Sequence, residues 1–208
     1  MKFSIVTPSY NQGHFIRTTI DSVLSQNYPD FEYLIMDGGS TDCTIDVLKS
    51  YGEAITWVSE KDGGQADAVN KGILRASGDI IGWLNSDDIY YPGTLNVVMK
   101  VFEDHPDVNV VYGHADHINY DGSFREEYYT EPWNYERLKE ICYICQPTVF
   151  FRRETVIKYG LLDVDRQFAM DYDLWLRMGK GETFYYLNRK LAGKELPAGS
   201  RIISAVNN

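Results

Sequence analysis

The sequence predicts an α/β fold with a mostly parallel central sheet flanked by helices. Two observations support this prediction. Five short apolar runs alternate with segments whose apolar residues recur at helical spacing, and the connections between them are short. Polar residues also follow the ends of several apolar runs, as they do in parallel sheets that bind ligands at the carboxyl ends of their strands.

Each predicted strand is a short apolar run closed by turn-forming residues. The first, FSIVTP, is stopped by Pro8, and the second, FEYLIMD, ends before the Gly38-Gly39 pair. The other three are AITWVSE at 54–60, DIIGWL at 79–84 and VNVVYG at 108–113.

Helices are predicted between these strands. Residues 14–26 place their apolar side chains on one face, which predicts an amphipathic helix. Ser40 or Thr41 is expected to cap a second helix that runs to about Tyr51. Two further helices are expected at residues 66–76 and after Pro92-Gly93.

The second half of the chain has a different pattern. HINYDGSFREEYY, from residue 117, predicts a hairpin with Asp121-Gly122 at its turn. TVFFRRETVIKYG, from residue 148, predicts a strand followed by a short helix, and MDYDLWLRMGKG predicts a helix that ends at Gly179 or Gly181.

The length of 208 residues suits one domain with a sizeable core. We expect a single domain over residues 1–208, with a first half at residues 1–112 and a second half at 113–190. Residues 191–208 have no strong period and are expected to form a loosely ordered tail.

Composition excludes some classes of function. The net charge of −10 means that the chain lacks the basic surface of a nucleic-acid-binding protein. We find no apolar run of about eighteen residues, and the apolar part of MKFSIVTPSY is too short for a signal peptide, so a cytoplasmic protein is expected. Aromatic residues make up 14%, which fits either an open cleft for sugars or bases or an aromatic-rich core.

Three cysteines are too few to predict a disulfide framework. Cys142 and Cys145 form a C-x-x-C pair, and His114 and His117 form an H-x-x-H pair. Together they would supply the four ligands of a zinc site. The apolar run around the cysteines favours the alternative, which is a pair of reduced and mostly buried thiols.

Asp87 and Asp88 directly follow the predicted fourth strand. Two adjacent carboxylates at the end of a buried strand repel each other and cost desolvation free energy. The pair therefore predicts a divalent cation, which binds through one or two carboxylates and completes its shell with water and phosphate oxygens. The alternative is a solvated turn, because Asn-Ser-Asp-Asp is rich in turn-forming residues.

Other polar residues are ambiguous when each is taken alone. Asp37 either accepts a hydrogen bond from a base or ribose, or belongs to a turn before the glycines. Asp171 begins a predicted helix, where a carboxylate either stabilises the helix dipole or acts as a general base. The loop before the helix at residues 66–76 carries Gly63-Gly64 and could place a helix N-terminus against phosphate. Because parallel strands end at one edge, one cleft could collect Thr7, Tyr10, Asp37, Asp62, Asp87 and Asp88.

Three segments, in this order, carry a resemblance to a known family. They are SIVTPSYNQGHFIRTTIDSVLSQNYPDFEYLIMDGGSTDCT, DGGQADAVNKGILRASGDIIGWLNSDD and AMDYDLWLR. Together they resemble the inverting glycosyltransferases of family two over about residues 3 to 178. The resemblance implies a GT-A fold and transfer of a sugar from a nucleoside-diphosphate sugar to a hydroxyl of a saccharide or lipid-linked saccharide, as in cell-surface polysaccharide synthesis.

The resemblance also implies roles for individual residues. Asp88 would bind Mn²⁺ or Mg²⁺, in an Asp-x-Asp element whose first position is Asn85 in this chain. Asp171 would be the catalytic base of a Glu-Asp motif, with Met170 in place of the Glu. The residues that would bind the nucleotide sugar are Thr7, Pro8, Tyr10, Asp37, Asp62 and Asp87.

The two halves of the chain would then bind different substrates. Residues 1–112 would bind the nucleotide sugar and residues 113–190 the acceptor, where Tyr128, Tyr129, Trp133 and Tyr135 either stack on a saccharide or belong to the core. A lipid-linked acceptor would bring the protein to the inner face of the membrane as a peripheral protein.

One departure from the family supports a rival function. Many relatives carry an Arg-x-His segment that closes over the donor, and LAGKELPAGSRIISAVNN does not contain it. A non-catalytic module that binds nucleotide sugars is therefore one alternative. A sugar-phosphate nucleotidylyltransferase is another, but it needs a glycine-rich basic loop after the first strand, where TPSYNQGHFIR has one glycine and Arg17.

Overall fold

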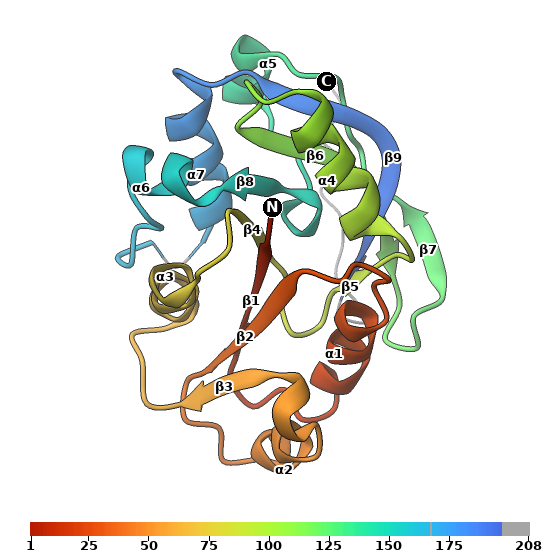
Figure 1. Ribbon diagram of the computed structural model, residues 1–208, viewed down its shortest axis with the longest axis vertical. Coiled ribbons are helices and arrows are strands. Elements are labelled where there is room, and N and C mark those ends of the chain that lie inside the picture. Colours follow the sequence, from red (N-terminus) through yellow and green to blue (C-terminus); the bar gives the residue numbers. More distant parts are fainter. Residues whose placement is uncertain (167, 197–208) are drawn as a thin grey trace.

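The computed structural model of the protein describes residues 1–166 and 168–196, and its first half follows the predicted alternation of strands and helices (Figure 1). Four strands lie in the order β3-β2-β1-β4, and every pair is parallel. Ser9 is the partner of Asp37, and Asp37 that of Ser59, so the carboxyl ends of three strands are level. The bounds are β1 (Phe3–Ser9), β2 (Phe31–Asp37), β3 (Thr56–Ser59) and β4 (Ile80–Trp83).

Four helices accompany these strands: α1 (Ile16–Leu24), α2 (Thr44–Lys49), α3 (Gln65–Arg75) and α4 (Thr94–Asp104), with a 3₁₀ turn at Gly52–Ala54. The prediction that Ser40 or Thr41 caps α2 is wrong, because Cys43 precedes the helix. The Asp42 carboxylate accepts the N–H of the helix's first residue, whereas the Ser40 N–H is donated to Asp37.

The rest of the sheet has strands of both directions, in the order β4-β8-β6-β9-β5, with β7 paired to β6. Of these, β5 belongs to the first half of the chain. β8 is antiparallel to β4 and β6, and β9 is parallel to β6. The expected α/β fold is thus confirmed, with its parallel pairs concentrated in the first half. The bounds are β5 (Ile89–Tyr90), β6 (Val110–Ile118), β7 (Phe124–Glu127), β8 (Phe150–Arg152) and β9 (Phe184–Glu195).

The predicted elements of the second half are confirmed. β6 and β7 form the hairpin, and Gly122 at its turn has a φ of +78°. β8 leads directly into α6 (Arg153–Tyr159), and α7 (Met170–Gly179) ends at the predicted glycine. The structure adds α5 (Tyr135–Glu140) and a 3₁₀ turn at Gln146–Thr148.

The prediction of a loosely ordered tail over residues 191–208 is wrong for its first part. Residues 191–195 end β9, in which Leu191 and Ala192 are fully buried. The alternation of a strand is hidden in the sequence because Asn188, Arg189 and Lys190 are consecutive and exposed. Residues 197–208 lie outside the described part of the chain.

Helices cover both faces of the sheet (Figure 1). α3, α5, α6 and α7 pack on the face that includes Val6 and Trp83, and α1, α2 and α4 pack on the face that includes Phe3 and Ile5. The alternation of Ile5 and Val6 between the two faces follows from the two-residue period of a strand. Gly72 lets α3 approach β1 closely, because a Cβ at this position would lie 2.3 Å from Val6 Cγ1.

Candidate active site

A cavity of about 610 Å³ opens at the carboxyl ends of β1, β2 and β4, where an α/β sheet typically binds its ligand. Four of the predicted site residues, Pro8, Tyr10, Asp62 and Asp87, line it. The other predicted site residues, which are Thr7, Asp37, Asp88 and Asp171, do not line the cavity. Its further lining residues are Ser9, Gln12, Gly38, Lys61, Gly64, Gln65, Ala68, Asn85 and Ser86.

The turn after β1 contributes a residue that was not singled out in the sequence. Ser9 is buried and lines the cavity, and among the described residues its hydroxyl has no hydrogen-bond partner. A buried polar atom without a partner is costly unless a ligand or water satisfies it. Tyr10 is 61% exposed at the cavity wall, whereas the Thr7 hydroxyl is buried against the Tyr33 hydroxyl at 3.0 Å.

Asp37 is buried behind the cavity wall, and its carboxylate holds the turn after β2. Oδ2 accepts the N–H groups of Gly39 and Ser40 at 3.1 and 2.9 Å and the Ser59 hydroxyl at 2.6 Å. Gly39 has a φ of +84°, a conformation that glycine adopts without strain. The structure therefore shows Asp37 as the residue that fixes this turn, and its direct contact with a nucleoside stays a prediction.

Asp62 approaches the same turn from the loop before α3. A Cβ on Gly38 would lie 2.9 Å from Asp62 Oδ2, so a larger residue at this position would displace the carboxylate. Asp62 Oδ1 accepts the Gly64 N–H at 2.8 Å, and the N-terminus of α3 borders the cavity through Gly64 and Gln65. The polar loop and the helix start thus lie at the cavity, as predicted.

Asn85 is the centre of a hydrogen-bond network at the end of β4. Its Oδ1 accepts Gln65 Nε2 at 2.8 Å and Trp83 Nε1 at 2.9 Å. Its Nδ2 donates to Gln146 Oε1 at 3.0 Å and to Asp88 Oδ2 at 3.3 Å. The asparagine at the first position of the Asp-x-Asp element therefore uses both donor and acceptor capacity, which an aspartate does not have.

Asp87 and Asp88 differ in their surroundings. The Asp87 side chain is half-buried at the cavity, whereas Asp88 is 1% exposed and its Oδ1 accepts the Glu195 N–H at 3.0 Å. Burial and the neighbouring Asp87 raise the pKa of Asp88 to about 8, although the Lys194 ammonium opposes them. Burial also raises the pKa of Asp87. Both carboxylates are thus stabilised by any cation placed beside them.

This donor set fits a divalent cation. A carboxylate offers about four lone-pair positions, and Asp88 uses two of them in the contacts to Glu195 and Asn85. The part of the chain that the structure describes has no group of three or more His, Cys, Asp or Glu side chains arranged to hold a metal. A cation at Asp87 and Asp88 would therefore take its remaining ligands from water and from phosphate oxygens.

Lys194 brings a positive charge to these carboxylates, and no sequence motif indicated it. β9 places it between Gly193, the partner of Ile89, and Glu195, whose N–H binds Asp88. Burial alone would lower the pKa of Lys194, but its interactions with Cys145, Asp88 and Asp171 raise it. Its ammonium also acts electrostatically on Asp87, which lines the cavity, and on Asp171, the predicted base.

Asp171 lies in the first turn of α7, outside the cavity lining. It is half-buried and acts electrostatically on Cys142, Lys194 and Tyr128. The residue before the helix, Ala169, has a φ of +54°. Asp171 is thus near the Asp87–Asp88 pair through Lys194, and its catalytic role stays a prediction.

The C-x-x-C and H-x-x-H pairs have other surroundings. Cys145 is buried and Cys142 half-buried, both as free thiols, and burial raises the pKa of Cys142 to about 11. His114 contacts Asn188 at 3.0 Å, and His117 faces Glu126. These contacts favour the interpretation as thiols over a shared zinc site.

The four aromatic residues of the second half divide between core and surface. Trp133 and Tyr135 pack against the core, and Trp133 stacks on Phe184 with ring centroids 4.1 Å apart. Tyr129 is 50% exposed, and Tyr128 packs on His117 with ring centroids 5.1 Å apart.

Over the described ranges, no helix is both long and apolar enough to cross a membrane.

Comparison with known proteins decides the family. A family model described as Glycosyl transferase family 2 matches residues 4–160, which is more than half of the chain. The chain belongs to glycosyl transferase family 2. The resemblance carried by the three sequence segments is therefore confirmed.

Curated glycosyltransferases match over most of the chain. An uncharacterized glycosyltransferase of Rickettsia prowazekii is 29% identical over 98% of this chain and 67% of its own length. One of Rickettsia typhi is 30% identical over 88% of this chain and 60% of its own length. The hyaluronan synthase of Pasteurella multocida is 32% identical over 89% of this chain, which corresponds to 19% of that enzyme. The chain thus spans only part of these relatives.

Solved structures confirm the GT-A fold. S. aureus TarS 1–349 in complex with UDP-GlcNAc matches with a TM-score of 0.79 and 19% identity, over 99% of this chain and 61% of that one. The mannosyltransferase PcManGT from Pyrobaculum calidifontis, in complex with GDP-Man and Mn²⁺, matches with a TM-score of 0.73 and 21% identity, over 96% of this chain and 58% of that one.

Proposed function

We propose that this chain is the catalytic domain of an inverting glycosyltransferase that takes a sugar from a nucleoside-diphosphate sugar. The acceptor would be a hydroxyl of a saccharide or a lipid-linked saccharide, as in cell-surface polysaccharide synthesis. The observation that carries the proposal is a cavity at the carboxyl edge of the sheet that Ser9, Asp62 and Asp87 line. Lys194 interacts electrostatically with Asp87 at this cavity, with the adjacent Asp88 and also with Asp171.

The cavity fits the nucleoside end of the donor. It is lined by the Asp62 carboxylate, the exposed ring of Tyr10 and the Ser9 hydroxyl, which has no hydrogen-bond partner within the described residues. Hydroxyl and carboxylate oxygens accept hydrogen bonds from a ribose or a base, and a ring packs on the face of a base. The TarS and PcManGT structures were solved with UDP-GlcNAc and GDP-Man, which supports a nucleotide-sugar ligand without choosing the base.

The diphosphate end would lie at Asp87. Asp87 and Asp88 would hold a divalent cation, Mn²⁺ or Mg²⁺, which supplies positive charge to the diphosphate when bound. The Mn²⁺ in the PcManGT structure supports this assignment. Lys194 adds a second positive charge from β9, so this acidic protein offers a locally cationic place for an anionic donor.

Asp171 would act as the general base. It would take the proton from the acceptor hydroxyl as the hydroxyl oxygen attacks the anomeric carbon of the donor sugar. The new carbon–oxygen bond forms on the face opposite to the bond from that carbon to phosphate, which breaks. The nucleoside diphosphate leaves with the electron pair, near Lys194, and the anomeric configuration inverts.

Donor hydrolysis tests this function without knowledge of the acceptor. Wild-type protein incubated with Mn²⁺ and UDP-GlcNAc or GDP-Man should slowly release the nucleoside diphosphate, with water in place of the acceptor. Asp171→Asn should lower this rate by roughly 10² to 10⁴ and leave donor affinity unchanged in calorimetry. Binding of a donor without any release would favour a non-catalytic module, and equal rates for Asp171→Asn would remove Asp171 as the base.

A further inference from the structure

The start of α7 carries the proposed base but lacks its own cap. Among the residues that the structure describes, no side chain caps the helix, and the residue before it, Ala169, adopts a φ of +54°. A non-glycine residue in this left-handed conformation is strained and persists only when its surroundings hold it there. The direction of the Asp171 side chain therefore depends on contacts elsewhere in α7 and in the connection from α6.

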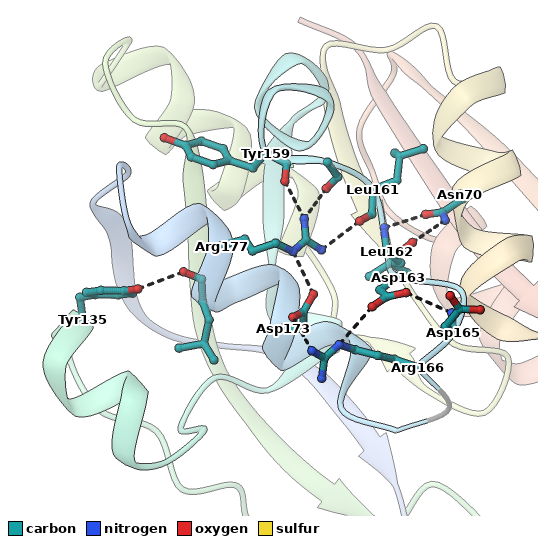
Figure 2. Close-up of polar contacts among 12 residues, drawn as sticks. Asn70, Tyr135, Tyr159, Leu161, Leu162, Asp163, Asp165, Arg166, Asp173 and Arg177 are labelled. Atoms are coloured by element: carbon teal, nitrogen blue, oxygen red, sulfur yellow. Dashed lines mark hydrogen bonds and ion pairs between the residues drawn. The ribbon is translucent and has the colours of Figure 1, made fainter.

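Arg177, in the last turn of α7, makes four of these contacts (Figure 2). Its Nη1 donates to the carbonyls of Tyr159 and Gly160 at 2.6 and 2.8 Å, and Nη2 to the carbonyl of Leu161 at 2.9 Å. Its Nε donates to Asp173 Oδ2 at 2.9 Å. One guanidinium thus binds the carboxyl end of α6 and the first turn of α7 together, in the fork geometry that arginine offers and lysine does not.

Asn70 holds the next residue of the same connection from the opposite side (Figure 2). It is 8% exposed on α3, its Nδ2 donates to the Leu162 carbonyl at 2.8 Å, and its Oδ1 accepts the Leu162 N–H at 2.9 Å. The side-chain amide therefore pairs with both backbone groups of one residue. Because the N-terminus of α3 borders the cavity through Gly64 and Gln65, this pair connects a cavity helix to the segment that leads from α6 to α7.

Asp173 completes the arrangement. Besides Arg177 it contacts Arg166 Nη2 at 3.3 Å, and Arg166 also reaches Asp163 at 3.4 Å (Figure 2). Asp173 lies two residues after Asp171, so an Asp173 variant would be the obvious control for the assignment of Asp171 as the base. Its ion pairs make it part of the support of α7, so a change at Asp173 is not neutral.

We infer that Arg177 and Asn70 are positioning residues for Asp171, because they fix the start of α7 against α6 and α3. This inference rests on the proposed function. Neither side chain reaches the reacting atoms, and both act through the orientation of the base. Displacement of a catalytic group by about 1 Å can cost roughly 100-fold in rate.

A double-mutant cycle tests the inference, with release of UDP from UDP-GlcNAc or GDP from GDP-Man as the readout. Arg177→Lys keeps the charge but not the fork, and Asn70→Ser removes the paired contact to Leu162. Each should lower the turnover number roughly 10- to 100-fold. Donor affinity in calorimetry should stay unchanged. In an Asp171→Asn background the same changes should have almost no further effect, because residues that act as a unit are not additive.

Glu32→Gln is the matched control, because it removes a half-buried, hydrogen-bonded carboxylate at the start of β2, at the strand end away from the cavity. If Arg177 only stabilised the fold, the Arg177→Lys and Glu32→Gln variants should have equal turnover numbers once their losses of thermal stability are matched. That result, or additive effects in the cycle, would overturn the inference while the wild-type activity stands. Absence of release by the wild-type protein would overturn the proposed function, and the positioning role with it.

Discussion

At the scale of single residues, Asn85 shows why the first position of the Asp-x-Asp element is an amide in this chain. An aspartate at this position could accept the hydrogen bonds from Gln65 and Trp83 but could not donate to Gln146 or Asp88. Gln146 is 3% exposed, and its Oε1 would lose the Asn85 donor. A third carboxylate would also lie within contact distance of Asp88, whose pKa burial and Asp87 already raise.

We therefore expect Asn85→Asp to destabilise the protein by about 1–3 kcal/mol, the usual cost of a buried polar group left without its partner. Urea unfolding in EDTA at neutral pH measures this loss. Asn96→Asp provides the matched substitution at an exposed amide that donates to the Asn27 carbonyl, and it should change stability by a few tenths of a kcal/mol. Equal stability of the two variants would show that the donor role of Asn85 is unimportant.

At the scale of elements, Glu32 at the start of β2 connects β1 to the turn before β4. It accepts hydrogen bonds from the Ser77 N–H at 2.6 Å, the Lys2 ammonium at 3.0 Å and the Ser4 hydroxyl. Burial alone would raise the pKa of Glu32, but these hydrogen bonds lower it from 4.5 to about 2. The carboxylate form is therefore bound more strongly in the folded chain than in the unfolded one.

A lowered pKa in the folded state makes a carboxylate stabilising above its unfolded value. The contribution of Glu32 should be complete above about pH 4.5 and disappear as the pH falls towards 2. Glu32→Gln should cost about 1–2 kcal/mol at pH 7, less than the full pKa shift implies because solvent screens this half-buried carboxylate, and the difference from wild type should shrink between pH 4.5 and 2. Urea midpoints measured across this range test the prediction. A difference independent of pH, or an equal one for Glu53→Gln at an exposed site, would contradict it.

The elements also show what the sequence can and cannot predict. The alternation in the first half and the hairpin at Gly122 follow from local patterns, so they were predicted closely. β9 was missed because its stability comes from pairing with β6, more than 70 residues away in sequence, and because a charged run hides its period. Lys194 was missed for the same reason, since only this pairing brings it to Asp88. The sequence likewise could not predict that the Ser9 hydroxyl has no hydrogen-bond partner among the described residues, because this depends on three-dimensional contacts.

At the scale of the whole molecule, β9 joins the two halves at the proposed reaction centre. It is parallel to β6, antiparallel to β5, and donates the Glu195 N–H to Asp88. Because Lys194 stands beside this contact, the second half supplies a positive charge to carboxylates that belong to the first half. In a chain with a net charge of −10, that local positive charge favours the binding of an anionic donor.

Lys194→Met should therefore weaken binding of a nucleoside diphosphate but not of the nucleoside. A hydrogen bond to a charged group contributes about 1.5–3 kcal/mol, so UDP or GDP affinity should fall roughly 10- to 100-fold in calorimetry with Mn²⁺ present. Lys190→Met is the matched control on the same strand, because its ammonium pairs with Asp116 at 2.7 Å and Glu127 at 3.1 Å instead. Both affinities should be unchanged in that variant. If Lys194→Met weakened uridine or guanosine as much as the diphosphate, Lys194 would only support the fold, and unchanged diphosphate affinity would exclude it from the phosphate site.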